Sequence, residues 1–264
     1  MTTKAVIFDF YGTLAETPDW GPSWSELVAS VGYELPDDIR DRWWNDGLDG
    51  SEHDEHSQSR DHYVAWQQSR VRGMLDECGV PPATQRELIT RVREIGAHRR
   101  MTAYDEVAGV LADLRARGLT LAICSNWDWD LAEAVDAAGL TGAFDVIVSS
   151  AWIGARKPHR RIYDAMVERV DIDPSHAVFI GDTWTCDVDG PRSYGFRPVY
   201  LRRTHFGPDT TAPDDHHEQD VHRATDLRVL LDLVADSSAA PTSGPRAPVR
   251  RDGSVRASGS APGP

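Results

Sequence analysis

Residues 4–14 have the sequence KAVIFDFYGTL, in which an apolar run ends abruptly at an acidic residue. The run from Lys4 to Phe8 has the length and the β-branched content of a buried strand. Asp9 follows this run directly, and Gly12 permits a tight turn three residues later. In parallel sheets, chemistry gathers beyond the carboxyl ends of the strands. This stretch therefore predicts the first strand of an α/β sheet, with Asp9 in a crevice at its end.

Four later apolar runs are predicted to complete the sheet. They are Leu119–Cys124, Phe144–Val148, Ala177–Ile180 and Pro198–Leu201. The helical stretches that separate them are Tyr104–Arg117, Asp128–Ala138 and Arg160–Val170. Strands that alternate with helices form right-handed crossovers, so we predict a parallel sheet flanked by helices. The polar residues at the strand ends are then expected to converge on one crevice.

Residues 16–101 interrupt this alternation, because they contain amphipathic helical stretches and no convincing buried strand. The stretches are Trp24–Val31, Arg60–Cys78 and Thr84–His98. Since the insert follows the first strand directly, we expect it to form an α-helical cap over the crevice. The core is then expected to comprise residues 1–15 and 102–235. Residues 236–264 are rich in Ser, Ala, Pro, Gly and Arg, which predicts a disordered tail.

The composition of the chain narrows its partners. The formal net charge of −14 argues against nucleic acid and anionic membranes, because both reward basic surfaces. The three cysteines are too few and too scattered for a disulfide framework, so a reducing cytoplasm is the expected compartment. The apolar run before Asp9 is too short for a signal peptide or a membrane span. We therefore expect a small-molecule partner, and the sequence leaves the oligomeric state open.

Four segments, in order along the chain, resemble the four motifs of the haloacid dehalogenase superfamily. They are Asp9–Leu14, Ile123–Asn126, Lys157-Pro158 and Gly181–Asp187. Each lies at the end of a predicted strand or in the loop that follows it. The resemblance implies a Rossmann-like core, a four-helix type of cap and a hydrolase whose covalent nucleophile is Asp9. A carboxylate in this role can attack phosphorus or carbon and divide one displacement into two easier steps.

The polar residues of these segments are candidates for substrate binding and charge stabilisation. Ser125 and Asn126 follow a strand and precede a helix, so their hydroxyl and backbone N–H groups are expected to point at one oxyanion. Thr13 can bind the transferred group or the backbone of the turn. The resemblance implies that Lys157 holds the nucleophile and neutralises the transferred anion. Lysine occurs at only two positions among 28 basic residues, which favours a need for a compact point charge here.

Two more acids in the last motif predict a metal site. Asp182 and Asp187 are expected to lie opposite Asp9, and three clustered carboxylates cannot all ionise comfortably without a cation between them. Hard oxygen ligands suit Mg²⁺. We expect Asp9 and Asp182 to bind Mg²⁺ through their side chains and Tyr11 through its backbone carbonyl, with Asp187 in a supporting role.

Tyr11 is where the chain departs from the pattern of the family's phosphatases, which usually carry a second aspartate two residues after the nucleophile. That aspartate serves as the acid–base group, and a phenol with a pKa of about 10 is a poor substitute at neutral pH. L-2-haloacid dehalogenases have a tyrosine there, and a second one six residues after the motif lysine, which Tyr163 matches. They also replace the Gly-Asp of the fourth motif with uncharged residues, whereas this chain keeps Asp182.

Three functional hypotheses follow from these conflicting signals. The acidic cluster favours a Mg²⁺-dependent phosphatase that acts on a small phosphorylated metabolite through an aspartyl-phosphate intermediate. The tyrosines favour a 2-haloacid dehalogenase-like hydrolase that works through an aspartyl ester. The absent acid–base group is also compatible with a degenerate, non-catalytic protein that binds a phosphorylated ligand.

One further segment has a spacing that some metal sites use. His53 and His56 are three residues apart in a polar stretch that contains Gly and Ser. That composition favours a solvated loop over a zinc site.

Overall fold

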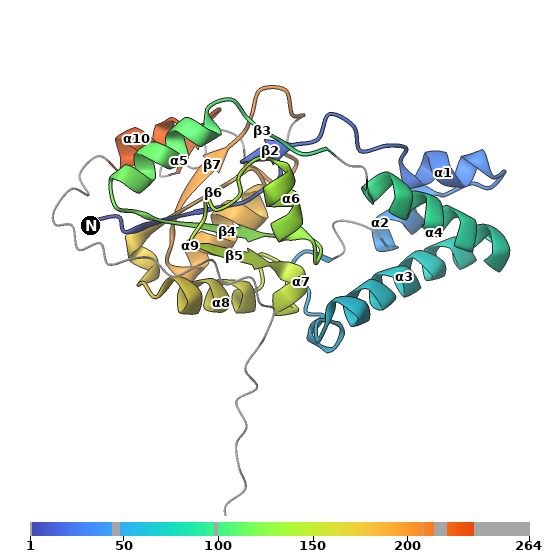
Figure 1. Ribbon diagram of the computed structural model, residues 1–264. Helices are drawn as coiled ribbons and strands as arrows, with labels where there is room; N and C mark the ends of the chain where they lie inside the picture. Colours follow the sequence, from blue (N-terminus) through green and yellow to red (C-terminus); the bar gives the residue numbers. More distant parts are fainter. Residues whose placement is uncertain (1, 44–47, 98–99, 208, 214–220, 235–264) are drawn as a thin grey trace, which may run out of the picture.

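The computed structural model describes residues 2–43, 48–97, 100–207, 209–213 and 221–234. Its centre is a six-stranded sheet with the strand order β5-β4-β1-β6-β7-β8, in which every neighbouring pair is parallel (Figure 1). The strands are β1 (Ala5–Phe8), β4 (Thr120–Ser125), β5 (Val146–Ser149), β6 (Ala177–Gly181), β7 (Arg197–Leu201) and β8 (His222–Ala224). This arrangement confirms the predicted fold class. The tail predicted over residues 236–264 lies outside the described residues.

Helices cover both faces of the sheet because successive side chains of a strand point to opposite sides. Val6 and Phe8 of β1 pack with the helices of one face, and Ala5 and Ile7 pack with α8 on the other. The first group of helices is α5 (Val107–Ala116), α6 (Leu131–Ala137) and α10 (Val229–Leu233). The remaining core helices are α7 (Ser150–Ile153), α8 (Arg160–Val170) and α9 (Gly190–Tyr194). All four residues of β1 are buried, as are all five of its neighbour β6, so Asp9 follows a strand in the enclosed centre of the sheet.

Four α-helices between residues 16 and 102 form a separate group with an apolar centre of its own (Figure 1). They are α1 (Trp24–Ser30), α2 (Asp37–Trp43), α3 (Arg60–Glu77) and α4 (Pro82–Ala97). Two short antiparallel strands, β2 (Ala15–Glu16) and β3 (Thr102–Ala103), join this group to the sheet. The sequence pattern did not predict these strands, because two residues are too few to show an alternation. Among the described residues, no helix has the length and apolar character that crossing a membrane requires.

A second connection between the helical group and the core runs through residues 49–57. Backbone hydrogen bonds join Gly50 N–H to Lys157 O (3.1 Å) and His53 N–H to Gly154 O (2.7 Å). The expectation of a solvated loop was wrong for His53, which is buried beside Tyr63 and has Nδ1 3.2 Å from the hydroxyl oxygen of Ser57. Hydrogen bonds to the core backbone remove parts of this loop from solvent. The composition of the segment does not reveal that pairing.

Candidate active site

The strand order places three polar side chains at one edge of the sheet. Strand β1 lies between β4 and β6, with Phe8 level with Ile123 on one side and Ile180 on the other. Asp9 follows directly and donates its backbone N–H to Ile180 O at 2.8 Å. Ser125 ends β4, and Asp182 follows β6. The predicted convergence of these polar strand ends is therefore present in the structure.

Lys157 links two of the acids from the loop before α8. Its Nζ lies 2.7 Å from Asp9 Oδ1 and 2.6 Å from Asp187 Oδ1, and its side chain is almost fully buried. Burial lowers the pKa of the Lys157 ammonium, but attraction by Asp187 and Asp9 outweighs it and holds the pKa well above its usual value. Ser125 also donates a hydrogen bond to Asp9 Oδ1 at 3.0 Å. Lys157 and Ser125 both contact Oδ1 of Asp9, so neither of these contacts involves Oδ2.

Asn126 forms hydrogen bonds with the backbone of Lys157. Its Oδ1 accepts a hydrogen bond from Lys157 N–H at 2.7 Å, and its Nδ2 donates to Lys157 O at 3.0 Å. The same Nδ2 donates to Asp49 Oδ1, on the segment from the helical group, at 2.9 Å. Thr13 is fully buried, and its hydroxyl has no hydrogen-bond partner among the described residues. The substrate-binding roles of Asn126 and Thr13 stay predictions, and of the two only the Thr13 hydroxyl is left without a protein partner.

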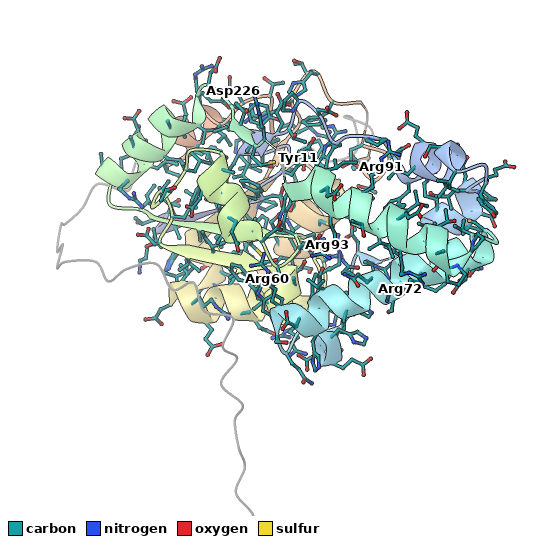
Figure 2. All side chains as sticks on the ribbon, turned by 45° about the vertical axis from the view of Figure 1, so that its right-hand side comes forward. Tyr11, Arg60, Arg72, Arg91, Arg93 and Asp226 are labelled. Atoms are coloured by element: carbon teal, nitrogen blue, oxygen red, sulfur yellow. The ribbon has the colours of Figure 1, made fainter. Side chains whose placement is uncertain are left out.

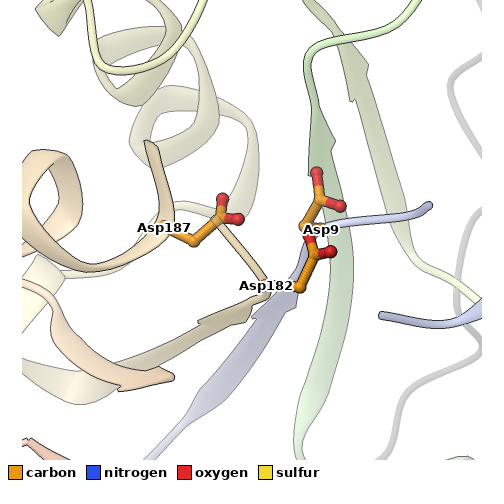
Figure 3. A group of neighbouring side chains, drawn as sticks. All are labelled: Asp9, Asp182 and Asp187. Carbon is orange, nitrogen blue, oxygen red and sulfur yellow. The ribbon is translucent and has the colours of Figure 1, made fainter. Parts of the chain in front are cut away.

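The carboxylates of Asp9, Asp182 and Asp187 form one cluster, with ligand oxygens within 4.8 Å of one another (Figure 3). Asp9 and Asp187 are buried, and Asp182 is partly exposed. Glycine is needed at two positions beside it. A Cβ on Gly12 would lie 2.3 Å from Asp182 Oδ2, and a Cβ on Gly181 would lie 2.3 Å from Asp187 Cγ. Gly12 also has a φ of +77°, which favours glycine on its own account. Both the backbone conformation of the turn and the close approach of Asp182 therefore require glycine at position 12.

The charge of this cluster exceeds what nearby cations neutralise. Burial, together with repulsion by Asp9 and Asp187, raises the pKa of Asp182 well above its usual value. Burial raises the pKa of Asp187 to about 6, against the attraction of Lys157. Lys157 supplies one positive charge, and Arg202 adds a partly exposed contact of 3.5 Å to Asp182 Oδ2. An all-oxygen donor set with surplus negative charge fits a hard divalent cation.

The two tyrosines that suggested dehalogenase chemistry lie in different surroundings. Tyr11 is half-buried, and its hydroxyl accepts a hydrogen bond from Trp20 Nε1 at 2.6 Å. Burial raises the pKa of Tyr11 above 10, so its phenol is neutral at physiological pH. Tyr163 is buried against Phe179 and donates its hydroxyl to Cys186 O at 2.9 Å. Tyr163 matches the dehalogenase pattern in sequence, and in the structure it packs in the core.

Arg203 is a residue at this site that the sequence pattern missed. From the loop after β7 it donates Nε to Gly12 O at 3.1 Å and Nη2 to Thr13 O at 2.6 Å. Its Nη1 lies 2.9 Å from Glu106 Oε1, and its guanidinium lies over the ring of Tyr104. Arg203 lies just beyond the end of a predicted strand, and this position could have identified it as a candidate, as it did Asp9 and Ser125. The carbonyls of Gly12 and Thr13 lie 191 and 190 residues away along the chain, so the sequence could not identify them as partners.

Comparisons with known proteins place these features among hydrolases. A family model described as a haloacid dehalogenase-like hydrolase matches residues 3–195. The chain is 33% identical to a phosphoserine phosphatase of Thermus thermophilus over 162 residues, 61% of each chain. It is 29% identical to an (S)-2-haloacid dehalogenase of a Pseudomonas species (strain YL) over 203 residues, 76% of this chain and 83% of the relative.

The match to the phosphatase spans less than two thirds of that protein's length. Solved structures agree in fold at lower identity. The predicted phosphoglycolate phosphatase of Haemophilus somnus is 18% identical, with a TM-score of 0.61 over 88% of this chain and 98% of its own. The L-2-haloacid dehalogenase RSc1362 is 23% identical, with a TM-score of 0.58 over 89% of this chain and all of its own. Phosphatases and dehalogenases therefore both stand among the similar proteins.

Proposed function

This chain belongs to the haloacid dehalogenase-like hydrolase family, and we propose that it is a Mg²⁺-dependent phosphatase that acts on a small phosphorylated metabolite in the cytoplasm. The observation that carries this proposal is the cluster of Asp9, Asp182 and Asp187, whose three carboxylates outnumber the positive charges of buried Lys157 and partly exposed Arg202. Surplus negative charge at a largely buried site costs free energy unless a cation balances it, and a bound metal ion would provide that cation.

In the proposed reaction, Asp9 attacks the phosphorus atom and the bond from phosphorus to the alcohol oxygen breaks. The resulting aspartyl-phosphate is then attacked at phosphorus by water, which releases phosphate and restores Asp9. Lys157 and Ser125 contact Oδ1 of Asp9 and leave Oδ2 for the attack. Lys157 contacts Asp9 directly and is proposed to neutralise the transferred phosphoryl group, and the hydroxyl of Thr13 has no partner among the residues that the structure describes.

Mg²⁺ would be held by the carboxylates of Asp9 and Asp182 and by the backbone carbonyl of Tyr11, with Asp187 in support. When bound, the ion would neutralise the negative charge of the phosphoryl oxygens. Asn126 fixes the backbone of Lys157, so it acts as a positioning residue in this proposal. Residues 16–101 are proposed to be a cap, which excludes water from the crevice and selects the substrate.

A dehalogenase is the second candidate, because Tyr11 stands at the position of the second aspartate and a dehalogenase aligns over 83% of its length. Such an enzyme must bind the carboxylate of a haloacid beside its nucleophile. Asp182 weighs against this, because L-2-haloacid dehalogenases use no metal, and without a metal ion a second carboxylate beside Asp9 would repel an anionic substrate.

One experiment separates the candidates. Phosphate release from p-nitrophenyl phosphate and halide release from 2-chloropropionate are measured with Mg²⁺ and with EDTA. We expect phosphate release that EDTA abolishes, no halide release, and no turnover by the folded Asp9→Asn variant. Halide release that survives EDTA would replace the phosphatase with the dehalogenase. Silence on both substrates and on a broader panel of phosphates would favour the non-catalytic hypothesis.

A further inference from the structure

Asp49 lies between α2 and α3 of the helical group, yet its side chain contacts the core. Its Oδ1 accepts hydrogen bonds from Asn126 Nδ2 at 2.9 Å and from Arg156 Nε at 3.1 Å. Nη2 of Arg156 lies 3.1 Å from the same oxygen. Asn126 follows Ser125 in the chain, and Arg156 precedes Lys157. One carboxylate oxygen from the insert thus joins the two segments that carry these site residues.

The backbone around Asp49 is paired with the loop that carries Lys157. Gly50 N–H donates to Lys157 O at 3.1 Å, and Arg156 N–H donates to Ser51 O at 3.1 Å. These bonds hold the segment against the lysine loop. The Asp49 carboxylate is therefore kept in place by the core itself.

The first turn of α3 is also held on the core. Arg60 Nη1 lies 2.9 Å from Glu133 Oε1 of α6 (Figure 2), and Tyr63 donates its hydroxyl to Asp128 Oδ1 at 2.8 Å. Tyr63 is buried among the side chains of the core, whereas the rest of the helical group packs around its own apolar centre. The stretch from Asp49 to Tyr63 is therefore fixed to the core at both ends.

The contact with Asp49 completes the hydrogen bonds of the Asn126 amide. Oδ1 of Asn126 accepts from Lys157 N–H at 2.7 Å, and Nδ2 donates to Lys157 O at 3.0 Å. A side-chain amide has two N–H donors, so the second is available to Asp49. A hydrogen bond to a carboxylate is roughly twice as strong as one between neutral groups. Asp49 thereby restrains the side chain that holds both polar groups of the Lys157 backbone.

The position of the Lys157 backbone decides where its ammonium group lies. Nζ is 2.7 Å from Asp9 Oδ1 and 2.6 Å from Asp187 Oδ1, and the lysine side chain is almost fully buried. A close-packed side chain has little freedom to compensate for a shift of its backbone. In the proposed reaction, a misplacement of about 1 Å at such a group can lower the rate by about 100-fold.

We infer that Asp49 is a positioning residue for Lys157 and acts on it through Asn126. The insert between β2 and β3 thereby contributes a side chain to the support of the catalytic centre, besides its proposed role as a cap. The effect on the rate rests on the proposed phosphatase function, whereas the effect on the backbone of Lys157 does not.

The kinetic test compares Asp49→Ala with Asp54→Ala on p-nitrophenyl phosphate. Asp54 is the matched control, because it comes from the same segment and pairs instead with Arg161 of α8. We expect Asp49→Ala to lower kcat about tenfold and to leave KM within about twofold, because Lys157 acts on the transition state. Asp54→Ala should keep both values. Asp49→Asn should keep most of kcat, because its amide oxygen still accepts from Asn126.

A double-mutant cycle tests the route through Asn126. In the Asn126→Ala background, Asp49→Ala should change kcat little, because the residue on which Asp49 acts is already gone. Equal losses of kcat in both backgrounds would overturn the inference. Asp49→Ser, whose hydroxyl is shorter by one bond, gives the same comparisons should Asp49→Ala not fold.

Hydrogen exchange keeps this inference separate from the proposed function. We expect the exchange rate of Lys157 N–H, relative to that of Ile123 N–H in β4, to rise about tenfold in Asp49→Ala and to stay unchanged in Asp54→Ala. A constant ratio in Asp49→Ala overturns the inference, and so does a raised ratio with unchanged kcat in an active enzyme. A raised ratio in a protein that hydrolyses no phosphate contradicts the phosphatase and supports the role of Asp49.

Discussion

Tyr11 shows how one residue can redirect a site whose other members are in place. In the proposed reaction, a carboxylic acid at this position would protonate the leaving alcohol and its carboxylate would then activate water, and a phenol is a poor base for the second step at neutral pH. We predict that Tyr11→Asp raises kcat on alkyl phosphates by up to ~100-fold, the lower end of acid–base catalysis. The ring packs on Trp20 and Phe206, so its loss should also lower the free energy of unfolding by about 1–3 kcal/mol, less than for a fully buried aromatic residue.

The measurement is kcat on matched alkyl and aryl phosphates, with urea unfolding of both proteins. Tyr11→Phe is the control, because it keeps the packing and supplies no acid. A folded Tyr11→Asp variant without any gain on alkyl phosphates would show that another residue provides the proton.

At the scale of elements, Arg203 ties the loop after β7 to the turn after β1. It donates to the carbonyls of Gly12 and Thr13 and forms a buried ion pair with Glu106, where the chain returns from the helical group. We predict that Arg203→Met lowers the free energy of unfolding by about 3 kcal/mol, because Glu106 is left buried and unpaired. It should also lower kcat, because the turn that aims Asp9 loses two hydrogen bonds.

The double variant Arg203→Met/Glu106→Gln separates these two effects. Removing both charges should restore most of the stability, since the unpaired carboxylate is gone, while kcat stays low. Urea unfolding and steady-state kinetics on one aryl phosphate provide both values. Recovery of kcat together with stability would show that Arg203 acts only on the fold and does not position the turn.

At the scale of the whole molecule, the cluster of Asp9, Asp182 and Asp187 affects the stability of the fold. The pKa of Asp182 is raised, so its ionised form destabilises the folded state above that pKa, and a neutral side chain should relieve the strain. We predict that Asp182→Asn raises Tm in EDTA at pH 8 by about 2–5 °C. Mg²⁺ should raise Tm of the wild type, because a ligand that binds only the folded state stabilises it, and should leave Asp182→Asn unchanged.

Asp113→Asn is the matched control, because it removes one exposed charge from the middle of α5 and leaves the cluster intact. Differential scanning calorimetry over a Mg²⁺ series measures all three proteins. An equal rise in Tm for wild type and Asp182→Asn would mean that Mg²⁺ binds elsewhere.

The sequence by itself determined the sheet, the helical insert and the strand ends that carry Asp9, Ser125 and Asp182. These features depend on local periodicity, because a buried strand needs a continuous apolar run and a tight turn needs glycine. The carboxyl ends of parallel strands meet at one edge, so residues far apart in the chain could be placed together before the structure was known. Strand β8 was not predicted, because its three residues at the sheet edge are exposed or only partly buried and show no apolar pattern.

Tertiary structure alone decided what each side chain contacts. Asn126 serves the backbone of Lys157, Tyr163 is directed at a core carbonyl, and His53 is buried where a solvated loop was expected. The contacts of Arg203 with Gly12, and of Tyr11 with Trp20 and Phe206, form only because separate loops meet beyond β1. Composition and spacing record which groups a chain has. The direction of a side chain depends on the elements packed around it, and those elements come from distant parts of the sequence.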